Sequence, residues 1–319
     1  MKDRNTKDNG QMVFGQPAET AAEVKNSETI EDILKRDAAL VEKELERYLA
    51  EEYAGSNETT EAMRYSVLGG GKRIRAFLVL EFCRMFGGSD EAALPFACAL
   101  ECVHASSLIH DDMPCMDDDV LRRGKPSCHV KFGEAEALLA GDALLTFAFE
   151  LCASNKYVSH RAVRYAVATL AHESGVMGMM EGQTLDLKND AATYSDLKKI
   201  FLRKTSCLIK AACLLGYFAA VDTPASRDTE NIKKYADAVG LAFQIHDDIL
   251  DVKGDTATLG KTVGTDEKND RKTVLSFMSM SEAEDEETLL TLLAVEVISG
   301  YERSKNLCDL AVWLLSRKK

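Results

Sequence analysis

The chain contains few of the residues that interrupt helices or that mark disulfide-linked or metal-clustered proteins. It has five prolines in 319 residues, and its nine cysteines include no Cys-x-x-Cys pair. Scattered cysteines of this kind are typical of reduced thiols, so we expect a cytoplasmic protein. The formal net charge is −13. So acidic a chain lacks the basic footprint that nucleic-acid binding requires, which argues against nucleic acid as a partner.

Long hydrophobic runs are also missing from the sequence. We find neither a secretory-type N-terminal segment nor an apolar run long enough to span a bilayer, and we expect no stable membrane anchor. Residues 1–26 are polar and show no sustained period, which predicts a mobile N-terminal extension. Residues 27–319 are predicted to form a single domain.

What the chain does contain is apolar residues at three-to-four spacing, which is typical of helices. The spacing predicts helices over residues 30–48, 77–86, 94–109, 135–151, 162–180, 197–218, 232–252 and 289–315. Ser27 or Thr29 is a suitable N-cap for the first of them. Residues 94–109 and 235–252 are apolar on most sides, which indicates central helices. Strand-type alternation is absent, so we predict an all-α fold, a single large helical bundle with the active site between its central helices.

Two clusters of aspartates continue two of these apolar helices. The first is DDMPCMDDD at residues 111–119, and the second is DDILD at residues 247–251. Carboxylates cost free energy to desolvate and repel one another, so such clusters need cations. Mg²⁺ prefers carboxylate oxygens and is commonly shared with substrate phosphates, whereas the residue pattern of a calcium EF-hand is absent. A solvated acidic surface is the alternative, but it is disfavoured because both clusters continue apolar helices.

Basic residues gather beside these acids in an otherwise acidic protein. GGGKRIR at residues 69–75 places three basic side chains after a glycine run at a predicted helix start, where backbone amides favour an anion. It is not a P-loop, because Ser66 and Arg73 break that motif. Further candidates are Arg122-Arg123, Lys204-Thr205 and Lys261. Acids and bases together predict an anionic ligand bridged by metal.

These segments together resemble the polyprenyl synthetase family, the trans-isoprenyl diphosphate synthases of short-chain type. The resemblance covers nearly all of the chain from residue 30 onwards, and its motifs run in family order. They are GGGKRIR, ECVHASSLIHDDMPCMDDDVLRRGKP, GEAEALLAGDALL, GMMEGQTLDL, RKTSCLIKAA, GLAFQIHDDILDV and DTATLGKTVGTD. The first aspartate motif has the longer form that is typical of bacterial farnesyl and of bacterial and plant geranylgeranyl diphosphate synthases.

The resemblance implies a fold, a reaction and a homodimer. The reaction condenses isopentenyl diphosphate with dimethylallyl, geranyl or farnesyl diphosphate, and three Mg²⁺ ions assist it. It also implies roles for individual residues. The metal would be held by Asp111, Asp112, Asp117, Asp247, Asp248 and Asp251. The allylic diphosphate and the reacting carbons would contact Arg122, Lys204, Thr205, Gln244 and Lys261, the first four being the catalytic candidates. Isopentenyl diphosphate would contact Lys72, Arg75, His104 and Arg123, and Gln183 and Asp186 would give support through hydrogen bonds or water.

The residues before the first aspartate motif bear on product length. In the family a bulky aromatic five residues before the first aspartate closes the pocket at farnesyl length, and here Ser106 and Ser107 stand at and beside that position. Five helical residues span about 7.5 Å, so a small side chain there deepens the pocket by roughly one isoprene unit. Geranylgeranyl diphosphate is the expected product, with farnesyl diphosphate as the alternative.

Two other functions are compatible with parts of the pattern. A class I terpene cyclase also ionises a prenyl diphosphate, but its second metal motif ends in a glutamate, and the nearest match here has Phe277 in that position. A non-catalytic subunit of a heteromeric synthase tends to lose acid residues, whereas both clusters are intact here. Three positions depart from the family pattern without removing a charged group from the proposed site: Ala76, Val274 and Trp313.

Overall fold

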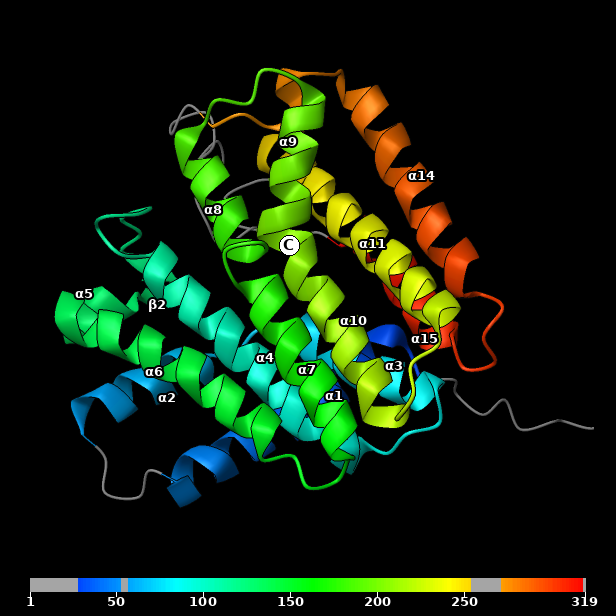
Figure 1. The fold of residues 1–319 in the computed structure, drawn as a ribbon. Coiled ribbons are helices and arrows are strands. Elements are labelled where there is room, and N and C mark those ends of the chain that lie inside the picture. Colours follow the sequence, from blue (N-terminus) through cyan, green and yellow to red (C-terminus); the bar gives the residue numbers. More distant parts are fainter. Residues whose placement is uncertain (1–27, 53–56, 254–270, 318–319) are drawn as a thin grey trace, which may run out of the picture.

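The described part of the computed structural model, residues 28–52, 57–253 and 271–317, is almost entirely helical (Figure 1). Its helices are α1 (Ile30–Glu52), α2 (Glu58–Val67), α3 (Ile74–Met85), α4 (Asp90–Asp111), α5 (Cys128–Phe132), α6 (Glu134–Ala153), α7 (His160–Ser174), α8 (Met179–Lys188), α9 (Tyr194–Phe201), α10 (Cys207–Ala220), α11 (Ser226–Lys253), α14 (Met280–Ile298) and α15 (Lys305–Ser316). A π-helical turn, η1 (Leu202–Ser206), joins α9 to α10, and a 3₁₀ turn, η2 (Val274–Ser276), precedes α14. The predicted all-α fold is confirmed.

One element has no counterpart in the sequence analysis. A two-stranded antiparallel hairpin pairs β1 (Leu121–Arg122) with β2 (Lys125–Pro126) directly after the first aspartate cluster. Arg123 and Gly124 form its turn with positive φ angles of 54° and 75°. Strands of two residues show no alternation, so periodicity could not have predicted them.

The helix starts follow the capping residues of the sequence. The backbone N–H of Asp32 donates to the Thr29 hydroxyl at 3.2 Å, and the Asp32 carboxylate accepts from Thr29 in return, which confirms Thr29 as a cap of α1. The hydroxyls of Ser89, Ser159 and Ser279 accept from the backbone N–H three residues on and cap α4, α7 and α14, and at Ser279 a carboxylate accepts in return. These caps set where each helix begins, because they satisfy N–H groups that have no partner within the helix.

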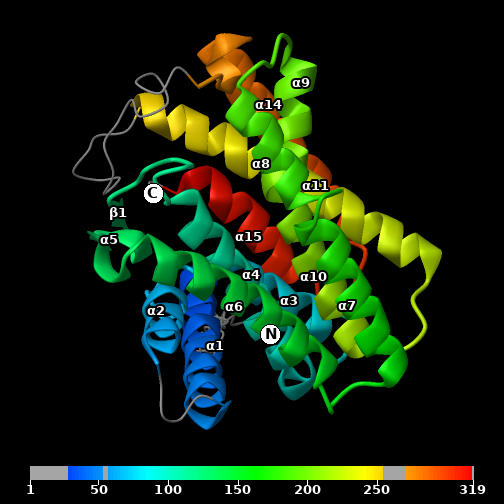
Figure 2. The ribbon, with the colours of Figure 1, turned by 60° about the vertical axis from the view of Figure 1, so that its left-hand side comes forward.

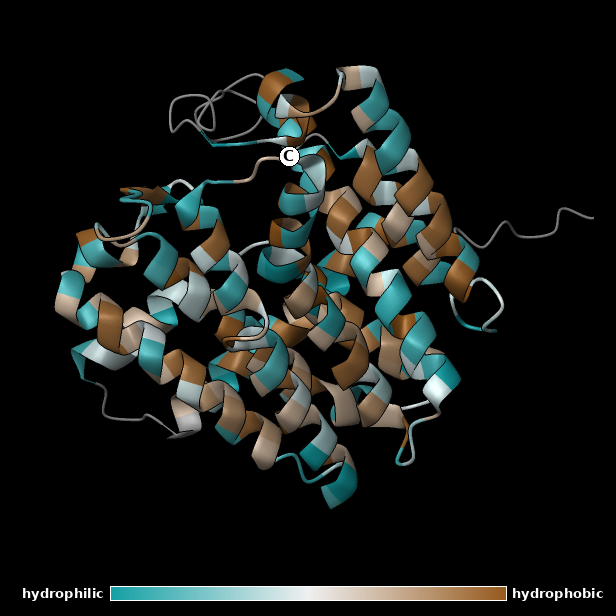
Figure 3. Cartoon of the chain, turned by 45° about the horizontal axis from the view of Figure 1, so that its top comes forward, coloured by the Kyte–Doolittle hydropathy of each residue, from teal (hydrophilic) through white to brown (hydrophobic). Residues whose placement is uncertain are grey.

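The core lies around α4, α10 and α11. α4 packs against α3, α6 and α10, while α11 lies between α10 and α14. Nearly every residue of α10 is buried, so this helix is as central as the two that the sequence indicated. Figure 3 shows apolar residues, in brown, interleaved with polar residues, in teal, along the helices. In Figure 1, α4 and α11 both end towards the upper left, so the packing brings the two aspartate clusters to one end of the bundle.

Two predicted helices are wrong in extent, because each is broken in the structure. Residues 162–180 cover α7 and the start of α8, since α7 ends where the Gly175 N–H donates to the Ala171 carbonyl. Residues 289–315 cover most of α14 and nearly all of α15, which a turn separates. In that turn Tyr301 packs edge-on against Phe86 and donates its hydroxyl to Asp228 at 2.8 Å. A tertiary contact therefore overrides the helical period.

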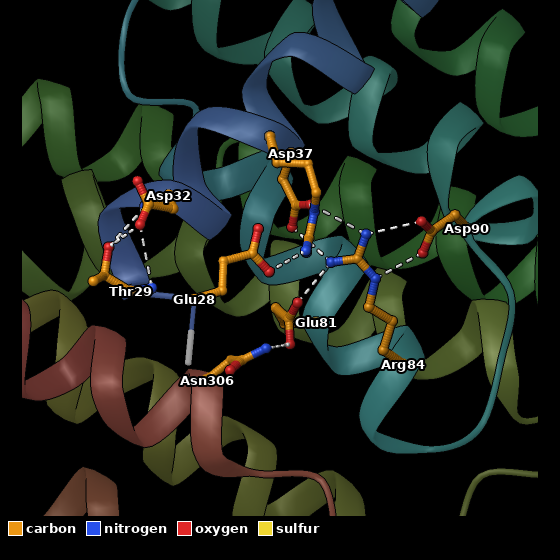
Figure 4. A network of polar contacts seen from close by, with 9 residues as sticks. Glu28, Thr29, Asp32, Asp37, Glu81, Arg84, Asp90 and Asn306 are labelled. Atoms are coloured by element: carbon orange, nitrogen blue, oxygen red, sulfur yellow. Dashed lines mark hydrogen bonds and ion pairs between the residues drawn. The ribbon is translucent and has the colours of Figure 1, made fainter. Parts of the chain in front are cut away.

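A polar network around Arg84 ties the first helices together at the edge of the core (Figure 4). The guanidinium donates to Asp37 of α1 at 2.6 Å, to Glu81 of α3 at 2.6 Å and to Asp90 of α4 at 2.7 Å. Asn306 of α15 donates to the other oxygen of Glu81 at 3.0 Å. The buried Asp37 and Glu81 carboxylates thus have partners, without which their desolvation would cost several kcal/mol.

Helix α4 alone, among the described residues, is long and apolar enough by composition to cross a membrane. From the sequence we expect no apolar run of this length, so the finding differs from that expectation. In the structure 78% of its most apolar window is buried by the other helices, which is the environment of a core helix. Figure 2 shows α4 enclosed by its neighbours in a second view.

Candidate active site

A cavity of about 420 Å³ lies beside the C-terminal end of α4. Its wall is contributed by α3, α4, α6, α8, η1 and α10 together with the loop after α4. The lining residues that the sequence analysis named are Arg75, His104, Ser106, Ser107, Asp111, Gln183, Lys204 and Thr205. The fold therefore brings residues that are far apart in the chain around one cavity. Arg75 and Thr205, for example, are 130 positions apart.

Asp111 is the last residue of α4 and faces this cavity. Burial raises the pKa of its carboxyl group to about 6, although the nearby Lys204 ammonium acts in the opposite direction. Helix α4 ends here because Pro114 disfavours helical backbone at the residue before it, and the N–H of Asp117 donates to the Asp111 carbonyl at 2.9 Å. The turn thus brings Asp117 close to Asp111, and the Asp117 carboxylate forms an ion pair with Arg271.

Asp112 is turned away from that position and is buried. Its carboxylate accepts from Arg122 Nε at 2.9 Å and from a second guanidinium nitrogen, and burial raises its pKa. Arg122 belongs to β1, so this ion pair fixes the hairpin against the end of α4. In this structure Arg122, a predicted contact of the allylic diphosphate, is therefore held by Asp112 and Asp119.

The second aspartate cluster lies inside α11. Asp247 is half-buried and forms an ion pair with Arg317 at 2.6 Å. Asp248 is buried and accepts from the backbone N–H of Val274 at 2.7 Å. Asp251 is also buried, and its Oδ1 atom has no hydrogen-bond partner among the described residues. The three carboxylates thus have different surroundings although they share one helix.

The π-helical turn η1 links the cavity to this second cluster. Lys204 reaches Asp186 of α8 at 2.6 Å, and the Thr205 hydroxyl donates to the Gln244 amide oxygen at 2.5 Å. The Gln244 amide nitrogen is 3.5 Å from the Asp247 carboxylate. Because the wider turn inserts an extra residue, it directs both Lys204 and Thr205 into the cavity.

A basic group lies at the start of α3 and beside α4. An Arg75 guanidinium nitrogen is 3.3 Å from His104 Nε2. Burial lowers the pKa of both side chains, and the charge of Arg75 lowers that of His104 further. Arg123 donates to the Gly70 carbonyl. These groups leave a positive potential that an anion would stabilise.

Lys72 lies at the outer edge of this basic group. Its ammonium is 5.0 Å from the ring centroid of Trp313 on α15, within the range of a cation–π contact. The indole N–H of Trp313 donates to Glu31 of α1 at 3.1 Å. Trp313, which departs from the family pattern, is therefore in contact with Lys72, which is predicted to bind substrate.

Some residues have roles that the sequence analysis did not anticipate. Arg73, in the same motif as Lys72 and Arg75, is buried and forms an ion pair with Glu101 at 3.0 Å, so it supports the fold. Arg271 and Arg317 pair with aspartates 154 and 70 positions away, and no local pattern announces such contacts. Lys261 and residues 1–26 lie outside the described residues.

The donor chemistry around the cavity fits Mg²⁺. The acids of both clusters offer carboxylate oxygens, which are hard ligands, and burial of Asp111 makes a nearby cation favourable. Within the described residues no three acids, histidines or cysteines form a ready-made metal cluster. A donor set of this kind suits an ion that takes its remaining oxygens from a substrate phosphate.

The comparisons with known proteins agree on one family. The family profile described as polyprenyl synthetase matches residues 56–307. This chain belongs to the polyprenyl synthetase family. Among curated members, the chain is 46% identical over 243 residues to a farnesyl diphosphate synthase of Escherichia coli (strain K12), covering 75% of this chain and 81% of that protein. It is 42% identical over 265 residues to geranylgeranyl pyrophosphate synthase 7, chloroplastic, of Arabidopsis thaliana, covering 81% and 76%.

Two solved structures of related enzymes have the same fold as this polyprenyl synthetase. A geranyltransferase from Legionella pneumophila superposes with a TM-score of 0.80 at 29% identity, covering 91% of this chain and 97% of that one. An FPP/GFPP synthase from Zymomonas mobilis superposes with a TM-score of 0.77 at 32% identity, covering 88% and 98%. The helical bundle predicted from the sequence is therefore the fold of the family.

Proposed function

We propose that this polyprenyl synthetase is a short-chain trans-prenyltransferase that condenses isopentenyl diphosphate with allylic diphosphates. The observation that carries the proposal is the convergence of Asp111, Lys204, Thr205 and the Arg75–His104 pair on one cavity. Its acidic side suits a metal-bound diphosphate, and its basic side suits a second one. A terpene cyclase would have no use for that second anion site.

The residues of the chain have distinct tasks in this reaction. Lys204 and Arg122 would stabilise the negative charge that develops on the departing allylic diphosphate. The oxygens of Thr205 and Gln244, 2.5 Å apart, would offer dipoles to the allylic cation. Arg75, His104, Arg123 and Lys72 would hold isopentenyl diphosphate so that its double bond attacks that cation, after which a proton leaves. Mg²⁺, which we propose as three ions on the two acid clusters, would supply Lewis-acid stabilisation of the leaving group when bound.

The proposed reaction is tested with purified protein, isopentenyl diphosphate and each allylic primer, in Mg²⁺ and in excess chelator. We expect prenyl diphosphate products only with Mg²⁺. The Asp111→Asn variant is the matched control, because it changes one carboxylate and keeps the shape of the side chain. Absence of any condensation product from the wild-type protein would refute the synthase proposal, and a cyclic hydrocarbon made from farnesyl diphosphate would favour a cyclase.

We further propose that the product is geranylgeranyl diphosphate. Ser106 is buried and lines the cavity about 7.5 Å along α4 from Asp111. Val103, Leu145 and Leu208 add apolar wall, which suits a growing prenyl chain. Ser106→Tyr is expected to shift the product from C20 to C15, while Ser106→Ala keeps the space and the C20 product. Chromatography of the products decides, and an unchanged chain length in Ser106→Tyr would contradict the proposed role of this position.

The remaining predictions concern assembly and location. We propose a homodimer, because α5 and α6 expose large apolar side chains at Val130, Leu138 and Leu139, which are about half exposed. We also propose one domain over residues 27–319, supported by a single connected core in the described part. The described part includes all nine cysteines as free thiols, which is consistent with a reducing, cytoplasmic location.

A further inference from the structure

One charged residue interrupts the buried face of α14. The residues of this helix that lie against its neighbours are Ala283, Glu287, Leu290, Thr291, Ala294 and Ile298. Glu287 is only 6% exposed. A carboxylate in such a position costs free energy unless it has a partner, so packing alone does not explain it.

The partner of Glu287 is His246, the residue before the second aspartate doublet. His246 Nδ1 is 2.7 Å from the Glu287 carboxylate, and Nε2 is 2.9 Å from the backbone carbonyl of Arg317. The Nδ1–Glu287 contact is close in distance but is not aligned as a hydrogen bond, whereas Nε2 hydrogen-bonds to the Arg317 carbonyl. His246 therefore connects α14 to the residue at the C-terminal end of α15.

Arg317 in turn reaches back to the same part of α11. Its guanidinium donates to Asp247 at 2.6 Å and to the Phe243 carbonyl at 3.1 Å, and it lies 3.8 Å from the centre of the Phe243 ring. The Arg317 side chain is only 5% exposed. Its backbone and its side chain are thus held separately, the backbone through His246 and the side chain by Phe243 and Asp247.

We propose that Glu287 and His246 are positioning residues that hold Arg317 on Asp247, and that Arg317 acts as a built-in counter-ion which competes with the metal for this carboxylate. The inference rests on the proposed function, because Asp247 is there a metal ligand. An arginine on the carboxylate avoids an uncompensated charge in the metal-free protein. The same contact must loosen or be shared when a cation takes those oxygens, so the arginine opposes metal binding.

The competition predicts a direction of change that a purely structural role does not. Arg317→Gln removes the counter-ion from Asp247, so we expect about fivefold tighter binding of Mn²⁺, a paramagnetic substitute for Mg²⁺, in the presence of inorganic diphosphate. Glu287→Gln, which loosens Arg317 indirectly, is expected to change the affinity in the same direction by a smaller factor. Electron paramagnetic resonance of free Mn²⁺, with inorganic diphosphate present to supply the remaining oxygens, measures both affinities without turnover.

A matched control and a double-variant cycle complete the test. Lys305→Gln removes one positive charge from an exposed position on α15 and is expected to leave Mn²⁺ affinity unchanged. In the Arg317→Gln background, Glu287→Gln is expected to add nothing, because it acts through Arg317. The amide of His246→Gln can still donate to the Arg317 carbonyl. Its Mn²⁺ affinity is therefore expected to stay closer to that of the wild type than the affinity of His246→Ala.

The outcomes separate this inference from the proposed function. Unchanged or weaker Mn²⁺ binding by Arg317→Gln overturns the competition, even if the wild-type protein condenses its substrates normally. Additive effects of the two substitutions overturn the positioning role of Glu287. If the wild-type protein neither binds Mn²⁺ nor catalyses condensation, both proposals fail. Thermal melting of each variant identifies any change of affinity that is due merely to unfolding.

Discussion

The two aspartate doublets differ in context, yet each divides its members in the same way. Asp111 ends a helix and Asp247 lies within one, and both are half-buried beside the proposed diphosphate site. The second members are buried and each fastens a later segment of the chain: Asp112 holds Arg122 of the hairpin, and Asp248 accepts from the Val274 N–H. Adjacent helical residues point about 100° apart, so a doublet cannot present both carboxylates to one point. One member lies towards the site, where Asp247 is paired with Arg317, while the other anchors a chain segment.

The largest expected effect is a difference in catalytic activity between substitutions of Asp111 and of Asp112, the two members of the first doublet. Asp111→Asn should lower kcat/KM for condensation by about 10³-fold, because it removes a proposed metal ligand worth several kcal/mol. Asp112→Asn should lower it by about 10- to 100-fold, since it acts through the position of Arg122. Steady-state kinetics with isopentenyl and farnesyl diphosphate measure both. Equal losses in the two variants would contradict the division.

A smaller effect concerns the anchoring role in the second doublet. Asp248→Ala leaves the buried Val274 N–H without its acceptor, and we expect the free energy of unfolding to fall by about 1–3 kcal/mol. Asp248→Asn retains an oxygen that can accept this bond, so its loss should be smaller. Urea denaturation measures the difference. If the two variants are equally stable, the hydrogen bond is not the anchor.

The smallest effect tests the cost of burying Asp111. Because burial raises the pKa of its carboxyl group to about 6, folding is more favourable when this group is protonated. The contribution of this group to stability therefore becomes less favourable as pH rises from about 4 through 6. Without metal, Asp111→Asn should be more stable than the wild type by about 1–2 kcal/mol at pH 7.

That stability gain should shrink as pH falls towards 4 and vanish below the pKa of the unfolded carboxyl group, where the group is protonated in both the folded and the unfolded protein. Urea unfolding in chelator between pH 4 and 7.5 measures the trend. Asp112→Asn serves as the contrast, since it leaves Arg122 without its closest carboxylate and should not gain stability. A gain for Asp111→Asn that does not depend on pH would exclude desolvation as its cause.

The sequence predicted the fold well where the signals were local. The three-to-four spacing identified the segments of α1, α3, α4, α6 and α11, and Thr29 marked the start of α1. The predicted extent of a helix was wrong where a tertiary contact ends it, as at Tyr301 in the turn between α14 and α15. The β1–β2 hairpin could not be predicted, because strands of two residues show no alternation of polar and apolar residues.

The candidate site could be predicted only in part for a related reason. Acid and basic residues next to recognisable motifs were named, and Arg75, His104, Asp111, Lys204 and Thr205 do meet at one cavity. Charge pairing across the fold was not accessible, so Arg271 and Arg317 were missed. Nor does a motif distinguish Asp111 from Asp112, or Arg73 from Arg75, because their difference is the direction in which each side chain points.

The contact between Lys72 and Trp313 has a practical consequence. Trp313 is the one tryptophan in the sequence. Fluorescence that is excited selectively in tryptophan therefore comes from a single indole, which lies beside a proposed diphosphate-binding lysine. A cation over an indole ring alters its emission, and a diphosphate that draws Lys72 away should alter it again. Occupancy of that side of the site could then be followed optically in unlabelled protein, without turnover.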